Sequence, residues 1–163
     1  MVPILPGKKR FISALKREPL FRALRCDKLT FAALQATIDL HLYQSAAGIP
    51  AIALLQVSED ELRIRAAAIV KRLENVAAQI SIGQGVVKVG GGTLPRSTIC
   101  SVTVDIVPRN CSLTDLAVRL RNSRPPVIGH IANDRFKLDL RTIFPQQDDL
   151  VVDAMRTACS QRF

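Results

Sequence analysis

The chain has 163 residues, of which 48% are hydrophobic and only 4% aromatic, and it contains no tryptophan. This length corresponds to about one domain with a sizeable core, and a core built from Leu, Ile, Val and Ala favours a helix-rich or mixed fold over a small all-β barrel. The formal net charge of +9 points to an anionic partner, while the scarcity of aromatic residues argues against base stacking as a way of binding nucleic acid.

The cysteine and histidine residues do not form a metal-binding pattern. The four cysteines contain no CxxC pair, and the two histidines have no ligand spacing to them, so we expect reduced thiols and no metal site. These residues are Cys26, Cys100, Cys111, Cys159, His41 and His130. No apolar run approaches a membrane span, and the start of the chain has too few apolar residues for a signal-peptide core. Together these features predict a cytoplasmic protein.

The first part of the chain is predicted to be helical. Prolines and a glycine break residues 3–7, and a helix is expected over residues 8–17 before Pro19 forces a turn. A longer helix is expected over residues 29–43, where apolar residues recur at helical spacing. These are Phe31, Leu34, Ile38 and Leu42. The sequence GIP at residues 48–50 closes this region, and a short apolar segment follows over residues 51–55.

Residues 16–28, KREPLFRALRCDK, are the most distinctive stretch. Arg22 and Arg25 lie three positions apart, so a helical turn would place both guanidinium groups on one face. Arginine is well suited to bidentate recognition of phosphate-type anions. The stretch also has an apolar side that we expect to be buried, formed by Leu20, Phe21 and Leu24. The spacing alone is compatible with an anion site or with a solvated basic turn between helices.

Two capping-box patterns predict where helices begin in the second part of the chain. Ser58 with Glu61 begins a helix that we expect to end near Gln79, and Ser112 with Asp115 begins a shorter one. The first helix has a single apolar stripe, formed by Leu62, Ala66, Ile69, Leu73, Val76 and Ala77.

Four strands and a last helix complete the prediction. Strands are expected at residues 86–89 and 99–107, joined through the sequence GGGTLP at residues 90–95. That glycine-rich segment lacks the strand–GxGxxG–helix context of a phosphate cradle, which favours a tight turn. Strands over residues 127–131 and 135–140 flank a turn at 132–134, and a helix is expected over 147–160. The order predicts an α/β two-layer sandwich, with a three- to four-stranded, mostly antiparallel sheet and helices on one face.

Four sequence clusters resemble one protein family in order and spacing. They are FRALRCDKLT at residues 21–30, VGGGTLP at 89–95, RPPVIGHI at 124–131 and LDLRTIFP at 138–145. This succession is similar to the C-terminal part of bacterial selenocysteine synthase, also called L-seryl-tRNA(Sec) selenium transferase, a fold-type-I enzyme that uses pyridoxal phosphate. The resemblance runs from about Gly7 to the end of the chain.

The resemblance implies a division of the chain and a function. Residues 1–50 would be a linking helical segment that leads out of a pyridoxal-phosphate-binding large domain, and residues 51–163 would be the small C-terminal α/β domain. The family converts seryl-tRNA(Sec) to selenocysteinyl-tRNA(Sec) with selenophosphate, and it forms homo-oligomeric rings of dimers. Arg22 and Arg25 match paired arginines placed to hold selenophosphate. Asp27 and Lys28 follow in the same motif, where an ion pair or a helix start is expected.

Two departures from the family affect the expected activity. His130 stands where the family usually has an arginine after the glycine, so substrate contact and a histidine packed on a strand both stay open. No lysine has the Ser-Gly-Asp-Lys context of the family's Schiff-base lysine, so we expect this chain alone to be inactive. Two alternatives to a fragment of the transferase are a non-catalytic module that binds an anion, tRNA or partner, and a related pyridoxal-phosphate lyase or aldolase.

Overall fold

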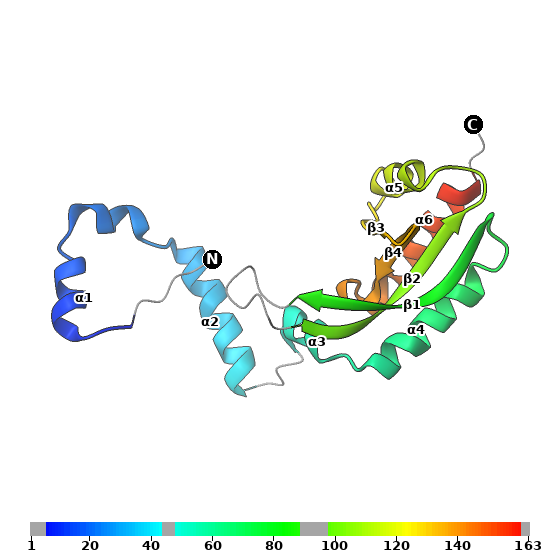
Figure 1. The fold of residues 1–163 in the computed structure, drawn as a ribbon. Coiled ribbons are helices and arrows are strands. Elements are labelled where there is room, and N and C mark those ends of the chain that lie inside the picture. The colour runs from blue at the N-terminus through cyan, green and yellow to red at the C-terminus, as the bar shows by residue number, and fades with distance from the viewer. Residues whose placement is uncertain (1–5, 44–47, 89–97, 161–163) are drawn as a thin grey trace. The chain divides into compact units, whose positions relative to one another are not determined.

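The computed structural model describes residues 6–43, 48–88 and 98–160. By its internal contacts the chain divides into two units, Met1–Ile52 and Ala53–Phe163. Figure 1 shows the helical elements of the first unit and the sheet with its helices in the second. Each unit is described by itself.

Unit 1 consists of short helices without a buried core of their own. They are α1 (Lys9–Leu15), the 3₁₀ helix η1 (Pro19–Leu24), α2 (Lys28–Tyr43) and the beginning of α3 (Pro50–Gln56). These positions confirm the helices predicted over residues 8–17 and 29–43. None of the described residues of this unit is buried, and the apolar stripe of α2 includes Phe31 and Leu42, which are 59% and 65% exposed. The segment predicted only as an apolar linker at residues 51–55 is part of helix α3.

Unit 2 contains a four-stranded sheet in which every pair is antiparallel. Its strands are β1 (Ala78–Lys88), β2 (Thr98–Pro108), β3 (His130–Ala132) and β4 (Arg135–Asp139), in the order β1-β2-β4-β3. The register places Val104 between Ile82 on one side and Leu138 on the other. The α/β class and the antiparallel sheet predicted from the sequence are therefore confirmed.

The helices of unit 2 bury one face of the sheet. α4 (Glu59–Arg72), α5 (Leu113–Arg121) and α6 (Asp148–Ser160) share a single hydrophobic core with the sheet. The sheet contributes alternate residues of two strands, as expected when one face of a strand is buried. The largest members of this core are Leu62, Ile69, Leu73, Val102, Val104, Ile106, Leu116, Leu120, Phe136, Leu138, Leu140 and Met155.

Both predicted capping boxes are present. Ser58 Oγ accepts a hydrogen bond from the backbone N–H of Glu61, and the Glu61 carboxylate accepts one from the backbone N–H of Ser58 at 2.9 Å. Ser112 and Asp115 repeat the arrangement at the start of α5. Hydrogen bonds from Ser58, chiefly from its backbone N–H, hold the pKa of the Glu61 carboxyl below its usual range. Those from Ser112, chiefly from its hydroxyl, lower the pKa of Asp115. Each box satisfies backbone N–H groups that have no partner within the helix.

The predicted end of the first capped helix is wrong. α4 ends at Arg72, and Gln79 lies in β1, which runs from Ala78 and not from residue 86. Leu73 and Val76 still pack against the core from the turn that follows α4, so the apolar stripe continues where the helix does not. The third strand is also shorter than predicted, since it begins at His130. The glycine-rich turn expected at residues 90–95 lies outside the described residues.

The predicted turn at residues 132–134 is present between β3 and β4. Asn133 and Asp134 both have a φ of 53°. Two successive residues with positive φ are typical of a type I′ turn, whose twist matches that of the flanking antiparallel strands. Asn and Asp tolerate this conformation better than most other non-glycine residues.

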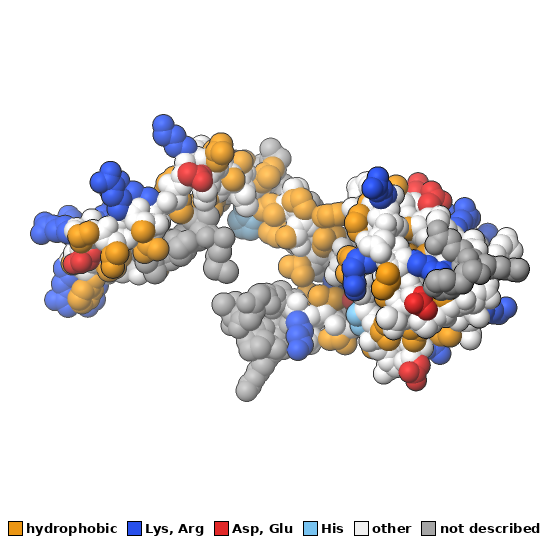
Figure 2. Space-filling model, turned by 90° about the horizontal axis from the view of Figure 1, so that it is seen from above, with side chains coloured by type: hydrophobic (Ala, Val, Ile, Leu, Met, Phe, Trp, Pro, Cys, Tyr) orange, Lys and Arg blue, Asp and Glu red, His pale blue; other side chains and the backbone are white. Residues whose placement is uncertain are grey.

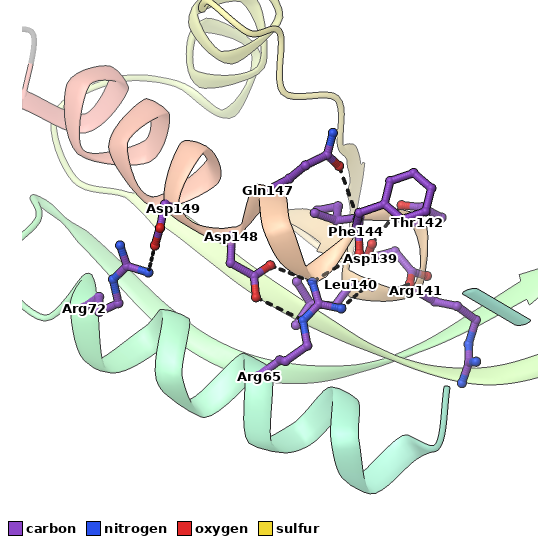
Figure 3. A network of polar contacts seen from close by, with 11 residues as sticks. Arg65, Arg72, Asp139, Leu140, Arg141, Thr142, Phe144, Gln147, Asp148 and Asp149 are labelled. Atoms are coloured by element: carbon purple, nitrogen blue, oxygen red, sulfur yellow. Dashed lines mark hydrogen bonds and ion pairs between the residues drawn. The ribbon is translucent and has the colours of Figure 1, made fainter. Parts of the chain in front are cut away.

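Two arginines tie the helices of unit 2 to the segment before α6. Arg65 of α4 donates hydrogen bonds to both Asp148 carboxylate oxygens, at 2.6 and 3.0 Å, and to the carbonyl of Ile143 at 3.1 Å (Figure 3). Arg141, which is only 4% exposed, donates to the carbonyls of Leu54 and Val57 around the end of α3. The bonds from Arg65 and from the two terminal nitrogens of Arg141 fix the local chain path, although the buried Nε of Arg141 has no hydrogen-bond partner.

Candidate functional site

The two arginines singled out in the sequence lie on one short helical turn. Pro19 begins η1, and its fixed φ suits the first position of a helix. The backbone N–H of Arg25, the residue after η1, donates to the carbonyl of Arg22 at 3.4 Å. In a 3₁₀ helix residues three apart are separated by one turn, so the turn considered for this pair is present from Arg22 to Arg25, which caps η1 with an extended backbone. Both arginines are exposed.

The apolar side of this turn was predicted to be buried, but it is largely exposed. Leu20 is 83% exposed and Leu24 is 66% exposed, and only Phe21 is half-buried. A six-residue 3₁₀ helix is too short to bury its own apolar side chains, so their burial depends on a neighbouring element. Within the described part of unit 1, no neighbouring element covers these leucines.

Neither arginine is neutralised by a carboxylate among the described residues. The acidic residue closest in sequence to Arg25, Asp27, accepts a hydrogen bond from the backbone N–H of Thr30 at 2.7 Å. This bond to the first turn of α2 is the main cause of the lowered pKa of Asp27. Asp27 therefore marks a helix start, one of the two roles expected for it, and none of the ion pairs found among the described residues involves Arg22 or Arg25.

His130, the third predicted residue, lies at the first position of β3. It pairs with Lys137 of β4 and its side chain is exposed. Gly129 precedes it, and a Cβ atom at that position would lie 2.5 Å from the carbonyl oxygen of Lys137. Only glycine permits this approach of the backbone to β4. His130 belongs to unit 2, whereas Arg22 and Arg25 belong to unit 1.

A polar cluster lies on the same side of the sheet as His130. Lys137 Nζ donates to Asp105 at 2.5 Å, and Thr103 Oγ1 donates to the other Asp105 oxygen at 2.6 Å. All three residues are at least nine-tenths buried. Gly83 on the neighbouring strand makes room for them, since a Cβ atom there would lie 2.5 Å from the Asp105 carboxylate. Burial of two opposite charges is tolerated here because each is paired and hydrogen-bonded.

None of the site residues predicted from the sequence belongs to this cluster. One signal was available, because polar and apolar residues alternate strictly along SVTVDI at residues 101–106. Such alternation marks a strand with two different faces. The pairing of Asp105 with Lys137 depends on the β2–β4 register and could not be read from a spacing of 32 residues.

The remaining expectations on sites concern metals, thiols and membranes. The described ranges contain no group of three or more His, Cys, Asp or Glu residues that could hold a metal ion. All four cysteines are free thiols. No helix within the described residues is long and apolar enough to cross a membrane.

Comparison with known proteins places these features in one family. The family model described as "SelA: L-seryl-tRNA selenium transferase" matches residues 2–144. A protein of Nitratidesulfovibrio vulgaris named L-seryl-tRNA(Sec) selenium transferase is 38% identical over 160 residues, which cover 95% of this chain and 34% of that protein. Proteins of the same name from Carboxydothermus hydrogenoformans and Aquifex aeolicus are each 36% identical, over 90% and 86% of this chain and 32% and 31% of their own lengths. The chain thus spans about a third of the length of these relatives.

Proposed function

The chain belongs to the L-seryl-tRNA selenium transferase family, and we propose that it is the C-terminal part of such an enzyme. The whole enzyme would replace the seryl hydroxyl of seryl-tRNA(Sec) with selenium from selenophosphate, in the cytoplasm and as a homo-oligomer. Residues 1–50 would lead out of the cofactor-binding domain, and residues 51–163 would be the small domain.

The exposed arginine pair is the observation that supports this proposal best. Arg22 and Arg25 lie one turn apart and have no carboxylate partner among the described residues. A guanidinium group donates two parallel hydrogen bonds to a phosphate-type oxyanion. We assign the two side chains the binding and orientation of selenophosphate, so that its selenium atom is presented to the seryl carbon.

His130 is a second candidate for contact with the substrate. Its side chain is exposed at the beginning of β3, and glycine before it keeps the strand close to β4. Neutral imidazole offers one donor and one acceptor, whereas the arginine that the family usually has here offers donors only. In our proposal His130 contacts the substrate through a single hydrogen bond.

Pyridoxal phosphate, which supplies an electron sink for the reaction, does not fit the lysines of this chain. Six of the seven lysines are exposed, and the amine of the seventh, Lys137, is bound by Asp105. A lysine that reacts with the cofactor needs an enclosed site that lowers its pKa. No step through the cofactor is therefore assigned to these residues.

Addition of pyridoxal phosphate to the 163-residue chain tests whether any of its lysines binds the cofactor selectively. We expect no stoichiometric adduct at any single lysine after reduction with borohydride, because exposed amines react weakly and without selectivity. Peptide mass spectrometry would detect such an adduct. One lysine modified to completion would contradict the assignment.

Anion binding tests the proposed role of the arginine pair. Selenophosphate is titrated into the chain and its ³¹P resonance is followed. The variant Arg22→Ala/Arg25→Ala should lose binding, whereas Lys71→Ala/Arg109→Ala, which removes the same charge from exposed positions of unit 2, should retain it. Equal binding by both variants would contradict the proposal.

A further inference from the structure

The region before the arginine pair carries a second concentration of positive charge. Five of the ten residues at positions 8–17 are basic and none is acidic. All five basic side chains are exposed. They are Lys8, Lys9, Arg10, Lys16 and Arg17, of which the four other than Arg10 are called the α1 basic surface below.

No described contact neutralises this charge. All five ion pairs found among the described residues lie in unit 2. Arg10 lies over the ring of Phe11 at 4.6 Å, and this is the one side-chain partner described for the basic residues of α1. Like charges that are close together on a helix repel each other, so an uncompensated cluster favours the binding of an anion with several charges.

The spacing of the charges suits an extended anion better than a single small one. Lys9 and Lys16 lie seven residues apart, which corresponds to two helical turns and about 10 Å along a helix axis. Figure 2 shows lysine and arginine side chains gathered over the part of unit 1 that carries α1 and η1. A polyanion with regularly spaced phosphates can engage such charges together, whereas one phosphate-sized ion cannot reach them all.

We propose that the α1 basic surface binds the phosphodiester backbone of RNA without reading its sequence. The inference rests on the proposed function, in which the substrate amino acid is carried on a tRNA, and it assigns a binding surface for that RNA in addition to the selenophosphate site. Lysine and arginine contacts to phosphates position a nucleic acid but carry no base information. The one aromatic side chain of α1, Phe11, lies beneath the guanidinium group of Arg10, so base stacking is not the main source of affinity here.

A membrane surface is the competing partner for a basic helix with apolar residues. α1 has only seven residues, and its exposed large apolar side chains are Phe11 and Leu15. The affinity of an interfacial helix grows with the apolar area that it buries in lipid. Within α1 two such side chains, one of them partly covered by Arg10, offer little apolar area, so the charge is better matched to RNA. Because Leu20 and Leu24 of η1 are also exposed, the test includes a membrane.

The salt dependence of RNA binding tests the inference on the intact 163-residue chain. The probe is a fluorescently labelled, unacylated tRNA(Ser) transcript, and its anisotropy is followed between 50 and 200 mM salt. Replacement of Lys8, Lys9, Lys16 and Arg17 by glutamine removes four phosphate contacts. The slope of log K against log[salt] should then fall in magnitude by about three, and affinity at 50 mM salt should fall by about 100-fold.

A control variant separates the effect of the α1 basic surface on RNA binding from the effect of the net charge of the chain. Glutamine at Lys71, Lys88, Arg109 and Arg121 removes the same charge from exposed positions of unit 2, and it should change the slope by less than about one. Equal effects of the two variants would overturn the inference. Binding of the unmodified chain to anionic phosphatidylglycerol vesicles without binding to the transcript would also overturn it.

The two proposals fail in different ways. If the transcript binds through the α1 basic surface but selenophosphate does not bind, the proposed selenophosphate site is wrong and the RNA surface stands. If selenophosphate binds through Arg22 and Arg25 but transcript binding is unchanged by the four glutamines, only the RNA surface is wrong.

Discussion

The substitution Lys137→Met should destabilise unit 2 by leaving a buried carboxylate without its charge partner. The side chains of Lys137 and Asp105 are 11% and 7% exposed, and their N–O distance is 2.5 Å. In the variant, Asp105 would keep only the hydrogen bond from Thr103 Oγ1. Methionine matches the length and flexibility of the lysine stem, so the loss of the charge dominates over the loss of packing.

The expected size of this effect follows from the burial. Removal of one partner of a buried ion pair costs about 3–5 kcal/mol. The hydrogen bond that remains on Asp105 places this case near the lower end, at about 3 kcal/mol. For a unit of this size such a loss lowers the melting temperature by roughly 10 °C or more.

Urea unfolding followed by far-ultraviolet circular dichroism measures the effect, since the chain has no tryptophan to report by fluorescence. Lys71→Met, at an exposed position, is the matched control and should change the free energy of unfolding by less than about 0.5 kcal/mol. The double variant Lys137→Met/Asp105→Asn should recover at least half of the loss, because it removes the unpaired charge. A loss below about 1 kcal/mol for Lys137→Met, or no recovery in the double variant, would refute the reasoning.

Three further substitutions test other parts of unit 2. Gly129→Ala should destabilise unit 2 by about 2 kcal/mol in thermal unfolding, because the new Cβ atom would lie 2.5 Å from a backbone carbonyl oxygen and from a core phenyl ring. An unchanged melting temperature would show that the strand can move aside. Ser58→Ala should cost more at neutral pH than at pH 2. Alanine keeps the backbone N–H that chiefly lowers the folded-state pKa of Glu61 below the usual 4.5, but it loses the hydroxyl that also lowers this pKa, whose contribution is present above that value and lost as pH falls through the folded pKa. The bond that Ser58 Oγ accepts from the Glu61 N–H is lost at both pH values, so an equal cost at pH 2 and at neutral pH would contradict this sign. Arg65→Gln should lower the free energy of unfolding in urea by about 2 kcal/mol, because it removes a largely buried bidentate contact to Asp148. Arg63→Gln removes an exposed i,i+4 pair and should cost less than about 0.5 kcal/mol. Similar values for the two variants would contradict the role given to burial.

Local patterns in the sequence were enough to predict most of the secondary structure. The capping boxes at Ser58 and Ser112 and the Asn133-Asp134 turn each depend on residues close in sequence, and all three are present. The helix end near Gln79 was wrong because the apolar period continues through a turn whose side chains also reach the core. Periodicity reports burial, and a helix and the turn after it can bury the same face.

Features that depend on tertiary contacts could not be predicted in this way. The Asp105–Lys137 pair follows from strand register, and the carbonyl partners of Arg141 lie up to 87 residues away in sequence. The exposure of Leu20 and Leu24 was also missed, because apolar composition predicts a preference for burial but not whether a neighbour is present. Of the site residues, Arg22 and Arg25 lie on the turn that their spacing allowed but did not establish, and the roles of these arginines and of His130 stay predictions.

Kinetics in a full-length relative shows whether the arginine pair holds the selenium donor. The arginines that correspond to Arg22 and Arg25 are replaced by alanine, and selenocysteinyl-tRNA(Sec) formation is measured while selenophosphate and seryl-tRNA(Sec) are varied separately. We expect kcat/KM for selenophosphate to fall by at least about 100-fold, as for loss of two charge-assisted contacts, with seryl-tRNA(Sec) binding changed by less than about threefold. Equal losses for the two substrates would contradict the claim and assign these arginines to tRNA phosphates or to folding.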